Sequence, residues 1–175
     1  MRASKAYLNI GRIALFSIFL ALALAACGEN SEPDGDALES IASIKVYKQA
    51  SCGCCGKWID HMEDAGFQVE PKNRVNLNTI KKEFGVSPKF QSCHTAVSEG
   101  YVFEGHIPAR VVQQFLAEKP PGAIGLSVPG MPVGSPGMEV GDKQVPYDVL
   151  LLKADGTAEV YVHIDQKAVS YTHLT

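Results

Sequence analysis

Apolar and polar residues alternate through several short segments of the chain and recur at helical spacing between them. Residues 44–48 alternate as a strand does, and residues 56–66 place an apolar side chain at every third or fourth position. Residues 67–70 alternate again. Two strands joined through a helix favour a parallel pair with a right-handed crossover. The pattern therefore predicts a β-α-β unit over residues 44–70.

The same patterns predict two further helices and four further strands along the rest of the chain. The helices cover residues 77–84 and 108–119, and the strands cover residues 90–97, 100–104, 147–153 and 158–164. Prolines and glycines are too dense in residues 128–141 for regular structure, which predicts a loop. The order β-α-β-α-β-β-α is that of the thioredoxin fold. We therefore predict an α/β fold, a single thioredoxin-like domain with an appended Gly/Pro/Met-rich loop and a C-terminal β-hairpin.

The first 26 residues have the three parts of a secretory signal: a basic start, an apolar run and small residues before a cleavage point. The sequence Leu24-Ala25-Ala26-Cys27 resembles a bacterial lipobox, in which the cysteine is acylated and becomes the new N-terminus. The apolar run is shorter than the ~20 residues of a membrane span. We therefore expect a lipoprotein of the bacterial periplasm, anchored to a membrane through Cys27. Gly28 replaces the aspartate that often signals inner-membrane retention, which favours the outer membrane in a Gram-negative cell.

The remaining boundaries follow from composition. Residues 27–40 are polar and acidic and read as a flexible tether, and residues 41–165 are long enough for one metal-binding domain. Residues 166–175 are predicted to be a non-native tail, because residues 169–175 resemble peptides translated from sequencing adapters. The signal has three basic residues and no acidic ones, so its removal moves the net charge from −3 to −6. Such an acidic chain has no electrostatic footprint for nucleic acid.

Three cysteines within four residues, Cys52, Cys54 and Cys55, stand where the first strand meets the first helix. Cys52 and Cys55 have the C-x-x-C spacing of a thioredoxin-like redox site, and a helix N-terminus lowers the pKa of a thiol. This predicts an envelope thiol–disulfide oxidoreductase as one function. Cys54 argues against its simple form, because it offers a competing partner for any disulfide.

A metal site is the other interpretation, and it brings in Cys93. A single zinc ion, held by Cys52, Cys55, Cys93 and His94, is possible, although the adjacent Cys54 and Cys55 diverge too much to share one tetrahedral ion. Cu(I) accepts two or three soft ligands and its thiolates bridge ions, so diverging sulfurs suit a multinuclear cluster. Equal numbers of thiolates and Cu(I) ions also sum to zero charge, which avoids a desolvation penalty. From the residues alone, copper, dithiol redox chemistry and zinc or iron–sulfur binding all stay open.

Two histidines and two methionines are secondary candidates for the metal site. His94 follows Cys93, and His106 ends a predicted strand; imidazole suits copper, especially Cu(II), although each ring could instead satisfy local backbone groups. Met131 and Met138 lie in the predicted loop, where thioethers could bind Cu(I) or pack the loop over the cysteines. His61 is expected to pack or support the site rather than bind metal. Trp58 is expected to pack the first helix against the sheet.

Four motifs, in this order, resemble one known family. They are SCGCCGKW at 51–58 followed by His61, SCHTA at 92–96, EGHIP at 104–108 and GMPVGSPGME at 130–139. The resemblance is to the CopG-type family of exported CxCC proteins, long filed as a domain of unknown function and associated with bacterial copper resistance.

This resemblance extends over nearly all of residues 44–164 and implies a thioredoxin-like fold that binds copper. It implies a copper–sulfur cluster on Cys52, Cys54, Cys55 and Cys93, and a redox role in interconverting Cu(I) and Cu(II) during detoxification. Other envelope copper-handling proteins are the expected partners. The lipobox does not follow from the resemblance, so membrane tethering through Cys27 depends on this chain alone.

Overall fold

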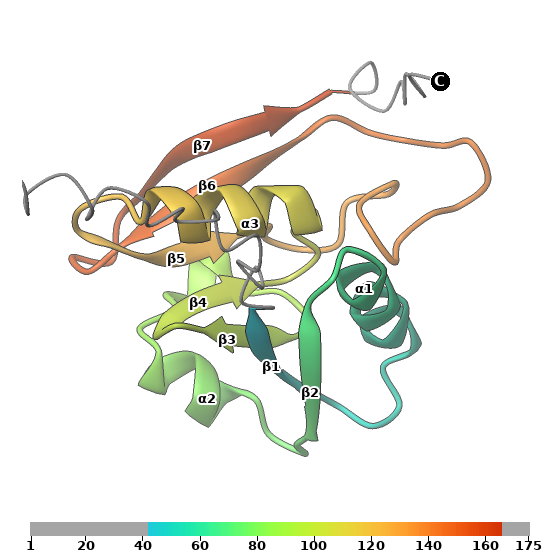
Figure 1. Cartoon of the computed structure of the whole chain (residues 1–175), viewed down its shortest axis with the longest axis horizontal. Coiled ribbons are helices and arrows are strands. Elements are labelled where there is room, and N and C mark those ends of the chain that lie inside the picture. The colour runs from blue at the N-terminus through green and yellow to red at the C-terminus, as the bar shows by residue number, and fades with distance from the viewer. Residues whose placement is uncertain (1–41, 166–175) are drawn as a thin grey trace, which may run out of the picture. The chain divides into compact units, whose positions relative to one another are not determined.

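The computed structural model of the protein describes residues 42–165 (Figure 1). The predicted signal peptide, the lipidated Cys27, the tether and the C-terminal tail lie outside these residues and stay predictions. No helix within residues 42–165 is both long and apolar enough to cross a membrane.

The predicted β-α-β unit is present, formed by β1 (Ser43–Lys48), α1 (Gly53–Asp64) and β2 (Gln68–Asn73). The strands pair in parallel, and β1 buries the alternate residues Ile44 and Val46. Helix α1 begins three residues earlier than the pattern predicts, so it contains Cys54 and Cys55 in its first turn. Strand β2 runs on through Pro71, which is tolerated because β2 is an edge strand of the sheet.

The remaining elements complete one mixed sheet of seven strands in the order β2-β1-β3-β4-β5-β6-β7. They are α2 (Asn78–Glu83), a short 3-10 helix η1 (Pro88–Phe90), β3 (Thr95–Ser98), β4 (Tyr101–Glu104), α3 (Ala109–Glu118), β5 (Ala123–Ser127), β6 (Tyr147–Lys153) and β7 (Ala158–Ile164). Strand β3 is antiparallel to both of its neighbours, β1 and β4. The first four strands thus form the sheet expected of a thioredoxin-like domain, and the C-terminal hairpin β6–β7 extends it (Figure 1).

Strand β5 is absent from the sequence prediction. It pairs in parallel with β4 and antiparallel with β6, so it joins the hairpin to the thioredoxin-like sheet. The apolar pattern did not predict β5 because a glycine in a short apolar run, here Gly125, is typical of a turn. Here a Cβ atom at Gly125 would lie 1.7 Å from the carbonyl oxygen of Val102, so only glycine lets the two strands approach. The predicted strand 90–97 also starts late, at Thr95, since Pro88 opens the 3-10 helix.

The sheet is covered on both faces. The larger core lies between the sheet and helices α1 and α3, and Trp58 is fully buried in it, as predicted. The indole Nε1–H of Trp58 donates to the carbonyl oxygen of Ile107 at 2.8 Å, so α1 is tied to the chain between β4 and α3. A smaller cluster on the other face contains Val86, Val102 and Leu152, beside the end of α2.

Candidate metal centre

Three chain segments leave the sheet at the same end of neighbouring strands, and each carries candidate ligands. Tyr47 near the end of β1, Thr95 at the start of β3 and Glu104 at the end of β4 pair side by side in the sheet. The CxCC motif follows β1, Cys93 and His94 precede β3, and His106 follows β4. The antiparallel register of β3 therefore brings together residues that the sequence separates by about forty positions.

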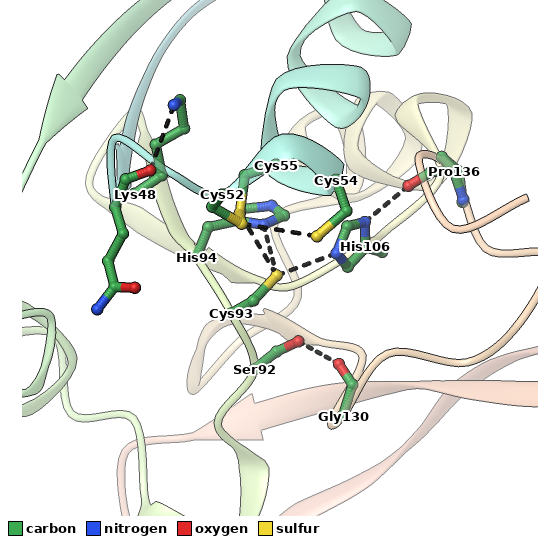
Figure 2. Close-up of a disulfide and its surroundings, with 11 residues drawn as sticks. Lys48, Cys52, Cys54, Cys55, Ser92, Cys93, His94, His106, Gly130 and Pro136 are labelled. Carbon is green, nitrogen blue, oxygen red and sulfur yellow. Dashed lines mark hydrogen bonds between the residues drawn. A yellow bond between two sulfur atoms is a disulfide. The ribbon is translucent and has the colours of Figure 1, made fainter.

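The four cysteines form one group (Figure 2). Cys52 and Cys55 are joined in a disulfide, while Cys54 and Cys93 are free thiols. The Sγ atoms of Cys52 and Cys54 are 3.6 Å apart, and those of Cys55 and Cys93 are also 3.6 Å apart. All four sulfurs lie within 4.8 Å of one another. Each sulfur of the disulfide therefore faces a free thiol.

The two predicted histidines lie beside Cys93. The Sγ atom of Cys93 is 3.0 Å from Nε2 of His106 and 3.3 Å from Nδ1 of His94, and both rings are fully buried. The Nδ1–H of His106 donates to the carbonyl oxygen of Pro136 at 2.7 Å, which leaves the lone pair of Nε2 directed at Cys93 (Figure 2). Nε2 of His94 has no hydrogen-bond partner within residues 42–165. The ligand atoms of these three residues also lie within 4.8 Å of one another.

Burial sets the protonation of this group. Burial, followed by the charge of Cys54, raises the pKa of Cys93 to about 12, so the metal-free side chain is a thiol. Burial lowers the pKa of His94 well below 6.5, and it lowers the pKa of His106 as well, so both rings are neutral at pH 7. A cation bound here would displace the proton of Cys93 without competing with charged imidazoles.

A buried ion pair contacts Ser92 and Thr95, the residues on either side of Cys93–His94, and was not predicted from the sequence. Lys81 and Glu104, 4% and 0% exposed, form a salt bridge, and burial of Glu104 raises the pKa of its carboxyl group. The Glu104 carboxylate also accepts hydrogen bonds from the Ser92 backbone N–H at 2.6 Å and the Thr95 hydroxyl at 2.8 Å. One carboxylate thus binds the backbone before Cys93–His94 and the side chain of the residue after them. The sequence signal is an acidic residue two positions after buried Val102, on the same face of β4.

The loop 128–141 covers one side of the site. A Cβ atom at Gly137, where φ is +83°, would lie 2.7 Å from the carbonyl oxygen of Cys54, so the loop packs directly on the first turn of α1. The Ser92 hydroxyl donates to the carbonyl oxygen of Gly130, and Pro136 holds His106. Of the two methionines, Met131 is 51% exposed and Met138 is half-buried. Their role as copper ligands stays a prediction.

His61 supports the site from α1. Its Nε2 atom accepts a hydrogen bond from the backbone N–H of Ala109 at 3.0 Å, which satisfies a free donor at the start of α3. Within the described residues it belongs to neither group that could share a metal ion. Together with Trp58, it fixes the turn that follows His106.

A thioredoxin-like domain with four cysteines and two buried histidines at one sheet edge is a thiol-based metal or redox protein. A family model described as "Protein of unknown function, DUF411" matches residues 90–138. Two solved structures of the copper resistance protein CopG, Form 2 and Form 1, are similar to this chain at 40% and 41% sequence identity, with TM-scores of 0.67 and 0.66. The similarity covers 71% and 70% of this chain, and 98% and 96% of the solved ones. No curated protein sequence matches. The chain belongs to the CopG copper resistance protein family, which confirms the resemblance of its motifs.

Proposed function

We propose that this protein binds copper in the bacterial cell envelope, holding Cu(I) through Cys52, Cys54, Cys55 and Cys93 in a multinuclear thiolate cluster. The solved relatives are named copper resistance proteins, and thiolates are the ligand class that selects Cu(I). His94, His106, Met131 and Met138 assist in loading the metal or in holding its oxidised form.

One observation carries this proposal: four sulfurs from two distant segments lie within 4.8 Å of one another. Two thiolates bound to one ion at about 2.3 Å each are separated by at most about 4.6 Å. The sulfurs are therefore close enough to share and bridge ions after small side-chain movements. Cys54 and Cys55 are adjacent in the chain, so they hold different edges of a cluster more readily than one ion.

Loading requires the Cys52–Cys55 disulfide to open. The disulfide takes up two electrons and two protons from a dithiol reductant of the envelope and becomes two thiols. The thiols then lose their protons to bind Cu(I). Exported thiols tend to oxidise, so the copper-free protein should accumulate in the closed form and bind copper poorly until it is reduced.

The same cysteines supply a copper redox reaction. Two Cu(II) ions each take one electron from the reduced Cys52–Cys55 pair, which yields two Cu(I) ions, one disulfide and two protons. The remaining thiols, Cys54 and Cys93, lie 3.6 Å from the disulfide sulfurs and can receive the Cu(I) formed. This reaction reduces Cu(II) to Cu(I), which is one direction of the interconversion expected for a detoxification role.

A thiol–disulfide oxidoreductase is the second candidate, and the Cys52–Cys55 disulfide at the N-terminus of α1 favours it. In that role Cys52 and Cys55 would exchange with a protein disulfide. The adjacent Cys54 and Cys93 thiols would compete with the substrate for each sulfur. This internal competition makes the copper role the better supported of the two.

The test is an anaerobic Cu(I) titration of the reduced chain from residue 27 onward. In that chain Cys27→Ser removes the remaining thiol and serves as the matched control. We expect several copper ions per chain to survive desalting in the control, and fewer to survive when Cys54→Ser is added. No retained copper, together with dithiol turnover that persists in Cys54→Ser, would establish the oxidoreductase instead.

Lipid attachment at Cys27 is proposed from the lipobox, with the outer membrane as its location. In cells that express the full chain, we expect the protein in the membrane fraction and the Cys27→Ser chain in the soluble fraction. Equal membrane association of the two chains would contradict lipid anchoring.

A further inference from the structure

The two sulfurs of the Cys52–Cys55 disulfide differ in accessibility. Cys55 is fully buried, whereas Cys52, the N-cap residue of α1, is partly exposed. An external thiolate can therefore reach only the sulfur of Cys52. Attack there leaves the electron pair of the broken bond on Cys55, in the first turn of α1, where backbone N–H groups favour a thiolate. The surface around Cys52 thus determines which reductant can open the disulfide.

Two basic side chains lie on that surface. The Lys48 ammonium and the Cys52 backbone N–H donate to the same carbonyl oxygen, that of Gln49, at 3.4 and 3.1 Å (Figure 2). Arg74 follows β2, and its backbone N–H donates to the Lys48 carbonyl oxygen at 2.8 Å. Its guanidinium carbon lies 5.8 Å from the centre of the Tyr47 ring. Both cations are therefore held beside the turn that leads into Cys52.

The charge of these two cations is not neutralised by nearby carboxylates. Among the described residues, no carboxylate forms a salt bridge with Lys48 or Arg74, whereas the neighbouring Lys45 and Lys72 both pair with Glu70. The chain as a whole is acidic, with a net charge of −3, so the two cations form a local site of opposite sign. Such a site attracts carboxylates and orients the molecule that carries them.

An exposed apolar side chain lies next to the cations. Val75 is 94% exposed, the highest value among the exposed large apolar side chains that the structure describes. Its carbonyl oxygen accepts a hydrogen bond from the Gln49 side chain at 3.5 Å, so Val75 is tied to the turn before Cys52. An apolar side chain bordered by cations fits a protein partner better than a small anion, which would contact the cations alone.

We propose that Lys48, Arg74 and Val75 form the docking surface for the protein that reduces the Cys52–Cys55 disulfide, and that this partner carries carboxylates beside a dithiol. The inference rests on the proposed function for the need to open the disulfide before copper binds. One partner thiolate attacks Cys52, displaces Cys55 and forms a mixed disulfide. The second partner thiolate attacks the partner's own sulfur, so the partner leaves as a disulfide. Two electrons pass to Cys52 and Cys55, which take up the two protons that the dithiol lost.

The test uses two synthetic dithiol peptides that differ only in the residues flanking a Cys-x-x-Cys sequence, glutamate in one and glutamine in the other. They reduce the disulfide-closed chain from residue 27 with Cys27→Ser, and thiol alkylation with mass spectrometry follows the opening. At about 20 mM salt, Lys48→Gln combined with Arg74→Gln should slow reduction by the glutamate peptide at least about 5-fold, and by the glutamine peptide less than about 2-fold. At about 0.5 M salt the difference should disappear, because the charges are screened.

Controls separate docking from general effects of charge and folding. Lys119→Gln combined with Lys153→Gln removes two exposed cations at the opposite end of the sheet and should leave both rates unchanged. Val75→Asp adds a negative charge to the docking surface and should also slow the glutamate peptide selectively, which gives a second variant should the first fail to fold. Equal slowing of both peptides, no slowing of the glutamate peptide, or the same slowing in the control would overturn the inference. Loss of Cu(I) retention by the reduced chain, with charge-selective reduction intact, would overturn the proposed cluster alone.

Discussion

The site has two sides that are held in different ways. On the α1 side, Cys52, Cys54 and Cys55 come from one short motif at a helix start, where Cys52 and Cys55 form a disulfide. On the β3–β4 side, Cys93, His94 and His106 come from two strand ends and are fixed by long-range contacts with Glu104 and the loop. The α1 side therefore contains the cysteines that a reductant can change, and the β3–β4 side contains side chains whose positions are set by hydrogen bonds from distant residues.

The largest expected effect comes from breaking the support of the β3–β4 side. Glu104→Gln leaves the Lys81 ammonium buried without its counter-charge, which should destabilise the protein by about 3–5 kcal/mol. Urea unfolding of the reduced and disulfide-closed chains measures this loss. Because the carboxylate also holds the Ser92 N–H next to Cys93, Cu(I) retention by the reduced chain should weaken, while the Cys52–Cys55 disulfide should still form.

Two further variants calibrate this prediction. Glu70→Gln removes an exposed carboxylate that pairs with Lys45 and Lys72, and should leave the unfolding midpoint nearly unchanged. Lys81→Met combined with Glu104→Gln removes both charges and should recover part of the lost stability. If Glu104→Gln behaves like Glu70→Gln, the ion pair does not support the site.

The sequence predicts the two sides unequally. The α1 side is readable because a strand, a helix and the CxCC spacing are all local patterns, and its error is a helix start three residues late. The β3–β4 side depends on pairing between distant strands. Its candidates Cys93, His94 and His106 could be named from their residue types and motifs, whereas the pairing of Glu104 with Lys81 and the Pro136 contact could not. Strand β5 was missed because Gly125 serves an interstrand approach that no local pattern records.

A smaller effect is the pH dependence of the stability of the folded protein. Burial lowers the pKa of His61, His94 and His106 below the ordinary value of 6.5. As pH falls below about 6.5, the unfolded chain takes up protons that the folded chain does not, so stability falls with decreasing pH. Each histidine contributes at most about 1.4 kcal/mol per pH unit to this loss.

Urea unfolding of the metal-free protein between pH 7.5 and about pH 5 measures the slope. His61→Gln should reduce the slope, while its amide oxygen preserves an acceptor for the backbone N–H of Ala109. A stability that is flat over this range, or that rises as pH falls, would contradict neutral burial of these rings.

The central claim is that the reduced α1-side sulfurs and Cys93 together hold Cu(I). Copper-edge X-ray absorption of the reduced, Cu(I)-loaded chain from residue 27, with Cys27→Ser, tests it most directly. The account predicts a first coordination shell dominated by sulfur, together with a short copper–copper distance, because bridging thiolates bring the ions together. A first shell dominated by nitrogen and oxygen, or sulfur ligation without neighbouring copper, would contradict the thiolate cluster.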